Sequence, residues 1–263
     1  MSPESPRRRC LAAIGLVLAA AFSAASAEPG PSSPPGIDSF YSGKIAALFA
    51  KDLEPPAADF DGSLRLLRID APANRLYVGL RQEMIVRASV EAVAAVLDDF
   101  ADYPRMFDDL LRAVPTETGP GAFSLLQEQR VPVPFVKNLT FTLNYLVDDR
   151  GAAGKGYLYK LMESNRLKFD DGMIRLSRTR EGECRFLEYD FALADWGVLG
   201  GVAPSKIWAA SISGTIVSDL SVKLRAEHPD WDLARVRAEA KREASKYDLR
   251  RIVSETLPAD AAF

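Results

Sequence analysis

Few side chains in this sequence could carry nucleophilic or metal-dependent catalysis. The chain of 263 residues holds one histidine, His228, and two cysteines, Cys10 and Cys184. A Ser-His-Asp triad, a multi-histidine metal site or a histidine acid–base pair would each have to be built around His228. We therefore assign no catalytic residue and expect neither a metal nor another cofactor.

The charge balance excludes another class of partner. Lys and Arg number 33 against 36 Asp and Glu, a formal net charge of −3. A nucleic-acid surface needs a clustered excess of basic residues to neutralise phosphates. The basic residues of 235–251 alternate with Asp and Glu, which favours a salt-bridged helix and no nucleic-acid partner.

Apolar side chains, aromatic rings among them, recur at every second position in three segments that we expect to be strands, residues 139–147, 156–162 and 187–193. Because successive side chains of a strand point to opposite faces, each aromatic set would line one face of a sheet. Opposite them, a helix expected from Pro204 onward presents mostly small side chains. The residues expected to line this binding face are Phe107, Phe141, Leu143, Tyr145, Tyr157, Tyr159, Tyr189, Phe191, Trp208 and Ile212.

Small side chains opposite aromatic rings predict unfilled volume. A void forfeits dispersion contacts in an otherwise close-packed interior, so a persistent one implies a ligand. Tyrosines would supply its polar groups, since a buried phenol seeks a hydrogen-bond partner. The alternative is that the rings pack tightly against the helix as an ordinary core. The residues alone leave both readings open.

Other suggestive spacings are interpreted as structural. Gly151–Gly156 looks superficially like a phosphate-binding loop, but no Ser or Thr follows its Gly-Lys pair and a strand comes next. The acidic residues between 98 and 109 are expected to be helix caps or solvated helix faces. Turns are expected at 148–151, 170–172 and 180–182, where Asp, Glu and Gly cluster.

The elements that must position these residues form an α+β arrangement. A short strand is expected at 63–69 and a long one at 75–88, because apolar and polar residues alternate there. Ser89 is expected to cap a helix over 90–100, followed by a short helix over 102–111. A meander of four or five strands is expected from Ala122 to Leu193.

Two helices are expected after the meander. Pro204 opens one that reaches Arg225, with Ile212, Ile216 and Leu220 at four-residue steps, although a strand over 207–217 is the alternative. Asp230 is then expected to cap a charged helix from 231 to about 254.

The start of the chain has the pattern of an export signal. Three arginines, an apolar run over 11–22 and Ala25-Ser26-Ala27 predict cleavage after residue 27, with an uncleaved anchor as the alternative. After cleavage, Cys184 alone would remain and no internal disulfide could form. We expect a signal peptide at 1–27, a linker at 28–36, an N-terminal helical extension at 37–74, the main domain at 75–226 and a charged C-terminal helix at 227–263.

The strand-to-helix opening carries a resemblance. Residues 86–93 read VRASVEAV, and residues 97–107 read LDDFADYPRMF, with an aspartate, an aromatic residue and Tyr-Pro. This opening resembles the START-like or helix-grip (SRPBCC) superfamily, in its polyketide cyclase and coenzyme Q-binding branch. The resemblance covers about 75–225 and implies a curved antiparallel sheet wrapped around a long C-terminal helix, with an internal cavity. The extra N- and C-terminal helices fall outside that pattern.

These observations predict an exported, periplasmic carrier of a hydrophobic small molecule such as a lipid, sterol-like or isoprenoid compound. One alternative is a cyclase- or aromatase-like enzyme acting on a polyketide-like substrate. The other is an envelope adaptor protein whose cavity is filled. The apolar segments Val131–Val136 and Trp196–Val202 are candidates for transient membrane contact. The residues do not indicate an oligomeric state.

Overall fold

The computed structural model describes residues 63–71, 75–131, 137–149, 151, 154–194 and 204–247. Within these ranges, side chains are described from 80 to 192 and from 212 to 247. The expected signal peptide, linker and helix near residue 40 lie outside the described residues. None of the described helices combines the length and the apolar character needed to cross a bilayer.

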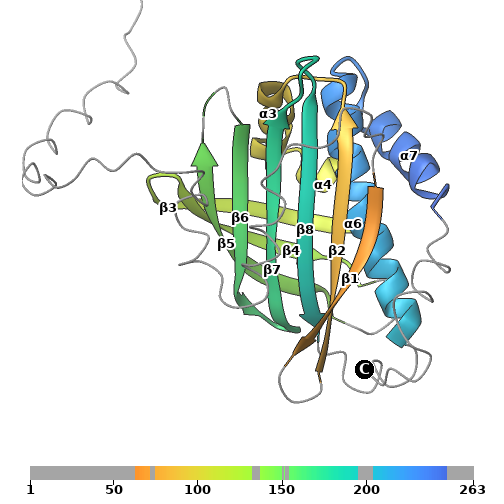
Figure 1. Ribbon diagram of the computed structural model, residues 1–263. Coiled ribbons are helices and arrows are strands. Elements are labelled where there is room, and N and C mark those ends of the chain that lie inside the picture. Colours follow the sequence, from red (N-terminus) through yellow and green to blue (C-terminus); the bar gives the residue numbers. More distant parts are fainter. Residues whose placement is uncertain are drawn as a thin grey trace, which may run out of the picture. The chain divides into compact units, whose positions relative to one another are not determined.

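An antiparallel sheet of eight strands forms the body of the described chain (Figure 1). Its order is β1-β2-β8-β7-β6-β5-β4-β3, so the strand before the first described helix pairs with the last strand of the meander. The strand expected at 63–69 is β1, and its pairing with β2 carries the sheet beyond the domain boundary expected at residue 75. The strands are β1 (Ser63–Ala71), β2 (Arg75–Val86), β3 (Leu110–Gly119), β4 (Ala122–Gln129), β5 (Leu139–Asp149), β6 (Gly154–Ser164), β7 (Leu167–Arg178) and β8 (Cys184–Ala194).

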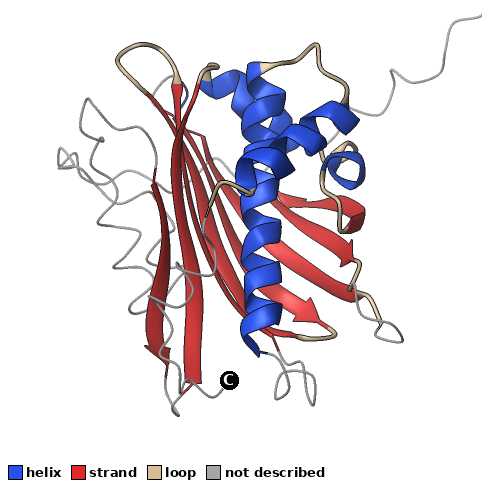
Figure 2. Ribbon diagram, turned by 90° about the vertical axis from the view of Figure 1, so that its right-hand side faces the viewer, coloured by secondary structure: helices blue, strands red, loops and turns tan. Residues whose placement is uncertain are grey.

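Four helices are described: α3 (Val90–Asp98), α4 (Tyr103–Met106), α6 (Pro204–Glu227) and α7 (Leu233–Ala244). Figure 2 shows α6 running along the concave side of the sheet, which curves around it. This is the α+β, START-like helix-grip arrangement that the sequence predicted, and the fold class is confirmed. The helical reading of 204–225 is also confirmed, and the strand alternative for 207–217 is wrong.

The face of the sheet turned toward α6 is called the inner face below, and the opposite one the outer face. One core joins the inner side chains of β2, β7 and β8 to α3, α6 and α7. Ile212, Ile216 and Leu220 of α6 are buried in it, at the four-residue spacing seen in the sequence. Packing such an apolar stripe supplies most of the stability of a helix in a folded protein.

The segment after α3 corrects one expectation. The short helix expected over 102–111 ends at Met106, and Leu110 instead begins β3. β3 is an edge strand, largely exposed, and it contains Pro115, which has no N–H to donate to a ladder. A largely exposed, proline-bearing edge strand lacks the apolar alternation by which strands are recognised, so the sequence did not predict it.

The turn expected at residues 170–172 is a second correction. These residues lie in the middle of β7, between β6 and β8. A Cβ added to Gly172 would come within 2.1 Å of the Tyr159 ring. The glycine is therefore needed for the close approach of an aromatic ring, not for a reversal of the chain.

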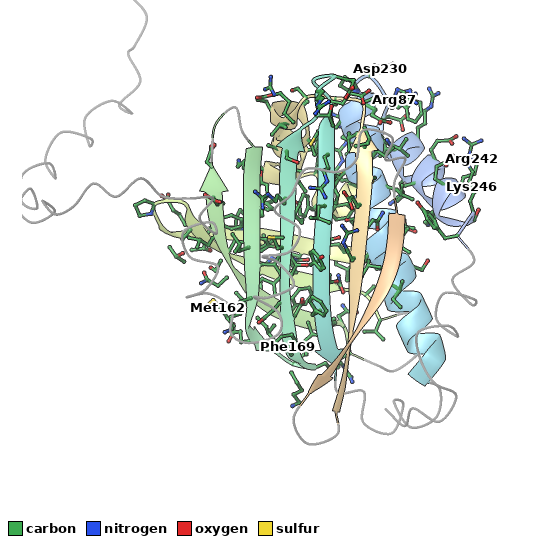
Figure 3. All side chains as sticks on the ribbon, in the orientation of Figure 1. Arg87, Met162, Phe169, Asp230, Arg242 and Lys246 are labelled. Atoms are coloured by element: carbon green, nitrogen blue, oxygen red, sulfur yellow. The ribbon has the colours of Figure 1, made fainter. Side chains whose placement is uncertain are left out.

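The helix caps confirm one expectation and correct another. Ser89 caps α3, with its hydroxyl accepting from the Ala92 backbone N–H at 3.2 Å. The helix expected from residue 231 begins at Leu233, and its cap is Asp232, not Asp230. The side chains of Arg242 and Lys246 extend from the side of α7 that faces away from the sheet (Figure 3).

Candidate functional site

The inner face carries a continuous row of six aromatic rings. Strand pairing sets Phe123 of β4 opposite Tyr145 of β5, and Tyr145 opposite Tyr159 of β6. Their centroids lie 4.7 and 5.4 Å apart, and Phe123 also contacts Phe100 at 5.1 Å. Tyr103 continues the row to the α4 segment. The aromatic row consists of Phe107, Tyr103, Phe100, Phe123, Tyr145 and Tyr159.

Five rings of the aromatic row remain partly exposed, and Tyr159 is buried. Three of these rings, Tyr103, Phe107 and Tyr145, pack against the core and still keep part of their surface accessible. Large apolar surface left in this state is typical of a site that receives another molecule. The row is therefore the candidate apolar wall of a binding site.

Most of the expected site residues lie on this side of the sheet. The structure brings together Phe107, Phe141, Leu143, Tyr145, Tyr157, Tyr159 and Ile212 on the inner side or facing it. Tyr157 has a local structural partner, because its hydroxyl donates to Asp98 Oδ1 at 3.0 Å, at the end of α3. The side chain of Trp208 lies outside the described residues, as does most of the two segments expected to touch a membrane.

The placement of Tyr189 and Phe191 on the binding face is wrong. Tyr189 lies opposite Arg81 on β2, and its phenol oxygen accepts from Arg81 Nε at 3.2 Å on the outer face. Phe191 stacks beside it, with centroids 6.2 Å apart. β8 is buried on both faces, so an apolar alternation there defines the period of the strand without showing which side faces the helix.

The acidic residues that β8 turns toward α6 are Glu188 and Asp190. Glu188 lies opposite Gln82 on β2, and Asp190 lies opposite Gly172 on β7. Asp219 of α6 is hydrogen-bonded to Glu188, and Asp170 of β7 is hydrogen-bonded to Asp190. These four acidic residues are called the carboxyl cluster: Asp170, Glu188, Asp190 and Asp219.

Tyr159 joins the carboxyl cluster to the aromatic row. Its ring lies across Gly172, and its hydroxyl reaches Glu188 Oε1 at 3.5 Å and the Tyr189 carbonyl oxygen at 3.4 Å. A hydrogen bond from Tyr159 also lowers the pKa of Asp190. The site therefore combines an aromatic wall with an acidic end, and Tyr159 belongs to both.

Burial raises the pKa of every carboxyl group in the cluster. The pKa values of Asp170 and Glu188 stand well above their usual range, because desolvation and the neighbouring carboxylates both disfavour the charged form. Desolvation raises the pKa of Asp190 to about 6 and that of Asp219 to about 7. In each hydrogen-bonded pair, one carboxylic acid thus donates to its partner: Asp170 to Asp190, and Glu188 to Asp219.

Several oxygens of this site accept no hydrogen bond from an N–H group or an alcohol or phenol O–H of the described residues. They are Gln82 Oε1, Glu188 Oε2, Asp190 Oδ1 and Asp219 Oδ2. The protons of Asp170 and Glu188 serve the two carboxyl pairs, which leaves Gln82 Oε1 without a donor among these residues. A buried acceptor without a donor costs about 1–3 kcal/mol, so this oxygen indicates that another molecule supplies one. The described part of the chain contains no grouping of His, Cys, Asp and Glu arranged to hold a metal ion.

The carboxyl cluster is the part of the site that sequence reasoning missed. Residues 170–172 were expected to form a turn, and Tyr189 and Phe191, not Glu188 and Asp190, were expected on the binding face of their strand. Asp219 follows the Ile212 and Ile216 stripe within one helical turn and could have signalled an acid on the buried face. The pairing of β7 with β8, which brings the acids together, is not visible in either strand alone.

No family model matches the chain, and no curated protein is similar to it. Among solved structures, the Zhui aromatase/cyclase from Streptomyces sp. R1128 is 18% identical, covering 64% of this chain and 95% of its own, with a TM-score of 0.44. A START superfamily protein from Mycobacterium smegmatis is 12% identical over 57% and 98%, with a TM-score of 0.43. A STAR-related lipid transfer protein from Xanthomonas axonopodis is 11% identical over 67% and 98%, with a TM-score of 0.39. At these values the similarities say nothing of a ligand.

Proposed function

We propose that this protein is an exported carrier that binds a small, largely hydrophobic molecule between the inner face of the sheet and α6. The observation that carries the proposal is the aromatic row, whose rings face inward but stay partly exposed. Apolar surface buried on binding contributes about 25 cal/mol per Å², so a ligand that covers several rings needs no reaction to be held. Export is proposed from residues 1–27, and the mass of the protein recovered after secretion, beginning at Glu28, tests it.

The experiment compares two neighbouring residues of β5 that point to opposite faces. Tyr145 belongs to the aromatic row, whereas Leu146 faces outward and pairs with Leu158. The uncharged fluorescent probe N-phenylnaphthylamine should bind the wild-type protein, and Tyr145→Ala should weaken this binding about ten-fold, equivalent to about 1.4 kcal/mol. Leu146→Ala should leave the probe affinity unchanged.

The outcomes separate binding from folding. Circular dichroism of both variants checks that each retains the native fold. Equal loss of probe affinity in both variants, or no binding by the wild-type protein, would refute a site on the inner face. If instead Tyr145→Ala alone weakens probe binding, organic extraction of the purified protein followed by mass spectrometry identifies the natural ligand.

A further inference from the structure

Gln82 adjoins the carboxyl cluster. Gln82 is the cross-strand neighbour of Glu188, and Asp219 is hydrogen-bonded to Glu188. The relative exposures of Gln82, Asp219 and Glu188 are 2%, 5% and 6%, so bulk water does not satisfy their free oxygens. Gln82 Oε1 and the ionised carboxylates of Asp190 and Asp219 can only accept, so a molecule that binds beside them must bring hydrogen-bond donors.

The charge of the cluster is also uncompensated. The groups that shift the pKa values of its four carboxyls are other carboxyls, Tyr159 and Thr215, with no Lys or Arg of the described residues among them. On the outer face of the same strands the pattern differs, since the buried Glu83 pairs with Arg81 at 2.6 Å and Arg185 at 2.5 Å. A buried carboxylate is costly unless it is paired. Among the residues whose side chains are described, the inner face therefore lacks the cation that the outer face has.

An aromatic wall next to this acidic end favours a cation over a neutral donor. Tyr159 contacts Glu188 with its hydroxyl and Tyr145 with its ring. Aromatic faces attract ammonium groups as well as apolar carbon. A primary ammonium carries three donors and no acceptor, which matches the free oxygens of the cluster.

From these contacts we infer that the ligand is an amphipathic amine, whose ammonium group binds the carboxyl cluster while its apolar part lies on the aromatic row. This inference rests on the proposed binding site and adds the chemical class of its occupant. Binding a cation requires the cluster to be ionised, so it should strengthen as pH rises. Among the described residues, the titratable groups facing the cluster from the packed elements are Tyr103 of α4, Tyr145 of β5, Tyr159 of β6, Asp170 of β7, Glu188 and Asp190 of β8, Asp219 of α6 and Tyr247 after α7.

The test uses three probes with the same ring system and different head groups: naphthylethylamine, ethylnaphthalene and naphthylpropionate. By calorimetry or ring fluorescence at about pH 7.5, the amine should bind at least about ten-fold more tightly than the neutral probe, and the acid more weakly still. Between about pH 8 and pH 5.5 the amine affinity should fall about ten-fold, while that of the neutral probe should change little.

Two variants test whether the preference for the amine depends on the carboxyl cluster: Asp219→Asn and its matched control Asp171→Asn. Asp171 is also a buried acid, next to Asp170 in sequence, but it points to the outer face. Asp219→Asn should remove most of the preference for the amine while ethylnaphthalene still binds. Asp171→Asn should preserve the preference for the amine. If Asp219→Asn does not fold, the pH dependence of amine binding to the wild-type protein still tests the inference, because it needs no variant.

The failures are distinguishable. Equal binding of amine and neutral probe, or an amine preference that survives Asp219→Asn, would overturn the amine assignment and leave the carrier function standing. Binding of none of the three probes would overturn both. Thermal stabilisation by Ca²⁺ alone, lost in Asp219→Asn, would show a metal in place of the amine and would also overturn the inference.

Discussion

Gly172 is the residue whose identity most directly determines the geometry of the site. A Cβ at this position would lie 2.1 Å from the Tyr159 ring, so any larger residue must displace the ring that joins the aromatic row to the carboxyl cluster. Gly172→Ala should lower the free energy of unfolding by about 1–3 kcal/mol, the usual cost of overpacking a core. Denaturant unfolding measures this directly.

Gly156→Ala provides the control for that substitution. Its added Cβ would meet the Asp148 Cβ at 3.6 Å, an ordinary contact, on the neighbouring strand β6. Its effect on stability should be small. If Gly156→Ala proved as destabilising as Gly172→Ala, a general intolerance of these strands would explain both, and the close approach to Tyr159 would not.

At the scale of elements, the cap of α7 can be tested with two aspartates. The sequence predicts Asp230 as the N-cap, and the structure shows Asp232 in that position. The Asp232 side chain accepts from the Arg235 backbone N–H at 2.8 Å, whereas Asp230 is exposed two residues earlier. Replacing an N-cap aspartate by alanine removes a partner of a free helix N–H and costs about 1 kcal/mol. Asp232→Ala should therefore lower the unfolding free energy by about that amount, and Asp230→Ala by much less. Equal effects would show that the observed cap is not the one that stabilises α7.

α7 is also tied to the segment that carries the end of the aromatic row. Asp108, which follows Phe107, forms ion pairs with Arg237 at 3.1 Å and with Lys241. These pairs are partly exposed, so each contributes little by itself. Their position nevertheless links the charged C-terminal helix to α4 and gives that helix a structural role beside the site.

For the whole molecule, the carboxyl cluster makes stability depend on pH in an unusual direction. An unfolded chain loses these protons near pH 4, whereas the fold keeps them until about pH 6 at Asp190 and about pH 7 at Asp219. The folded state binds more protons in this interval, so the unfolding free energy falls as pH rises through it and stays low above it. The shift at Asp190 alone corresponds to roughly 3 kcal/mol.

Ligand-free protein should therefore have a higher Tm near pH 5 than near pH 7.5, by about 2–4 °C for each kcal/mol. Asp219→Asn should flatten this dependence, because an amide holds no titrating proton, while the exposed Asp109→Asn should not. Scanning calorimetry across this pH range gives both answers. A Tm that rises steadily toward pH 7.5 would contradict the buried, uncompensated state of the cluster.

The sequence by itself determined the class of the fold. The alternation in residues 139–147 and 187–193, the cap at Ser89 and the Ile212 stripe are local patterns with a known period, and each element they predict is present. Aromatic candidates on β5 and β6 were also placed correctly, since these strands carry aromatic residues on one face only.

Only the tertiary structure decided which face of β8 meets α6 and that residues 170–172 continue a strand. Both depend on pairing with neighbouring strands, because a strand of period two has no preferred face when both are buried. That pairing gathers Asp170, Glu188, Asp190 and Asp219 from three separate elements, and their raised pKa values arise from mutual proximity and burial. No local pattern carries such information.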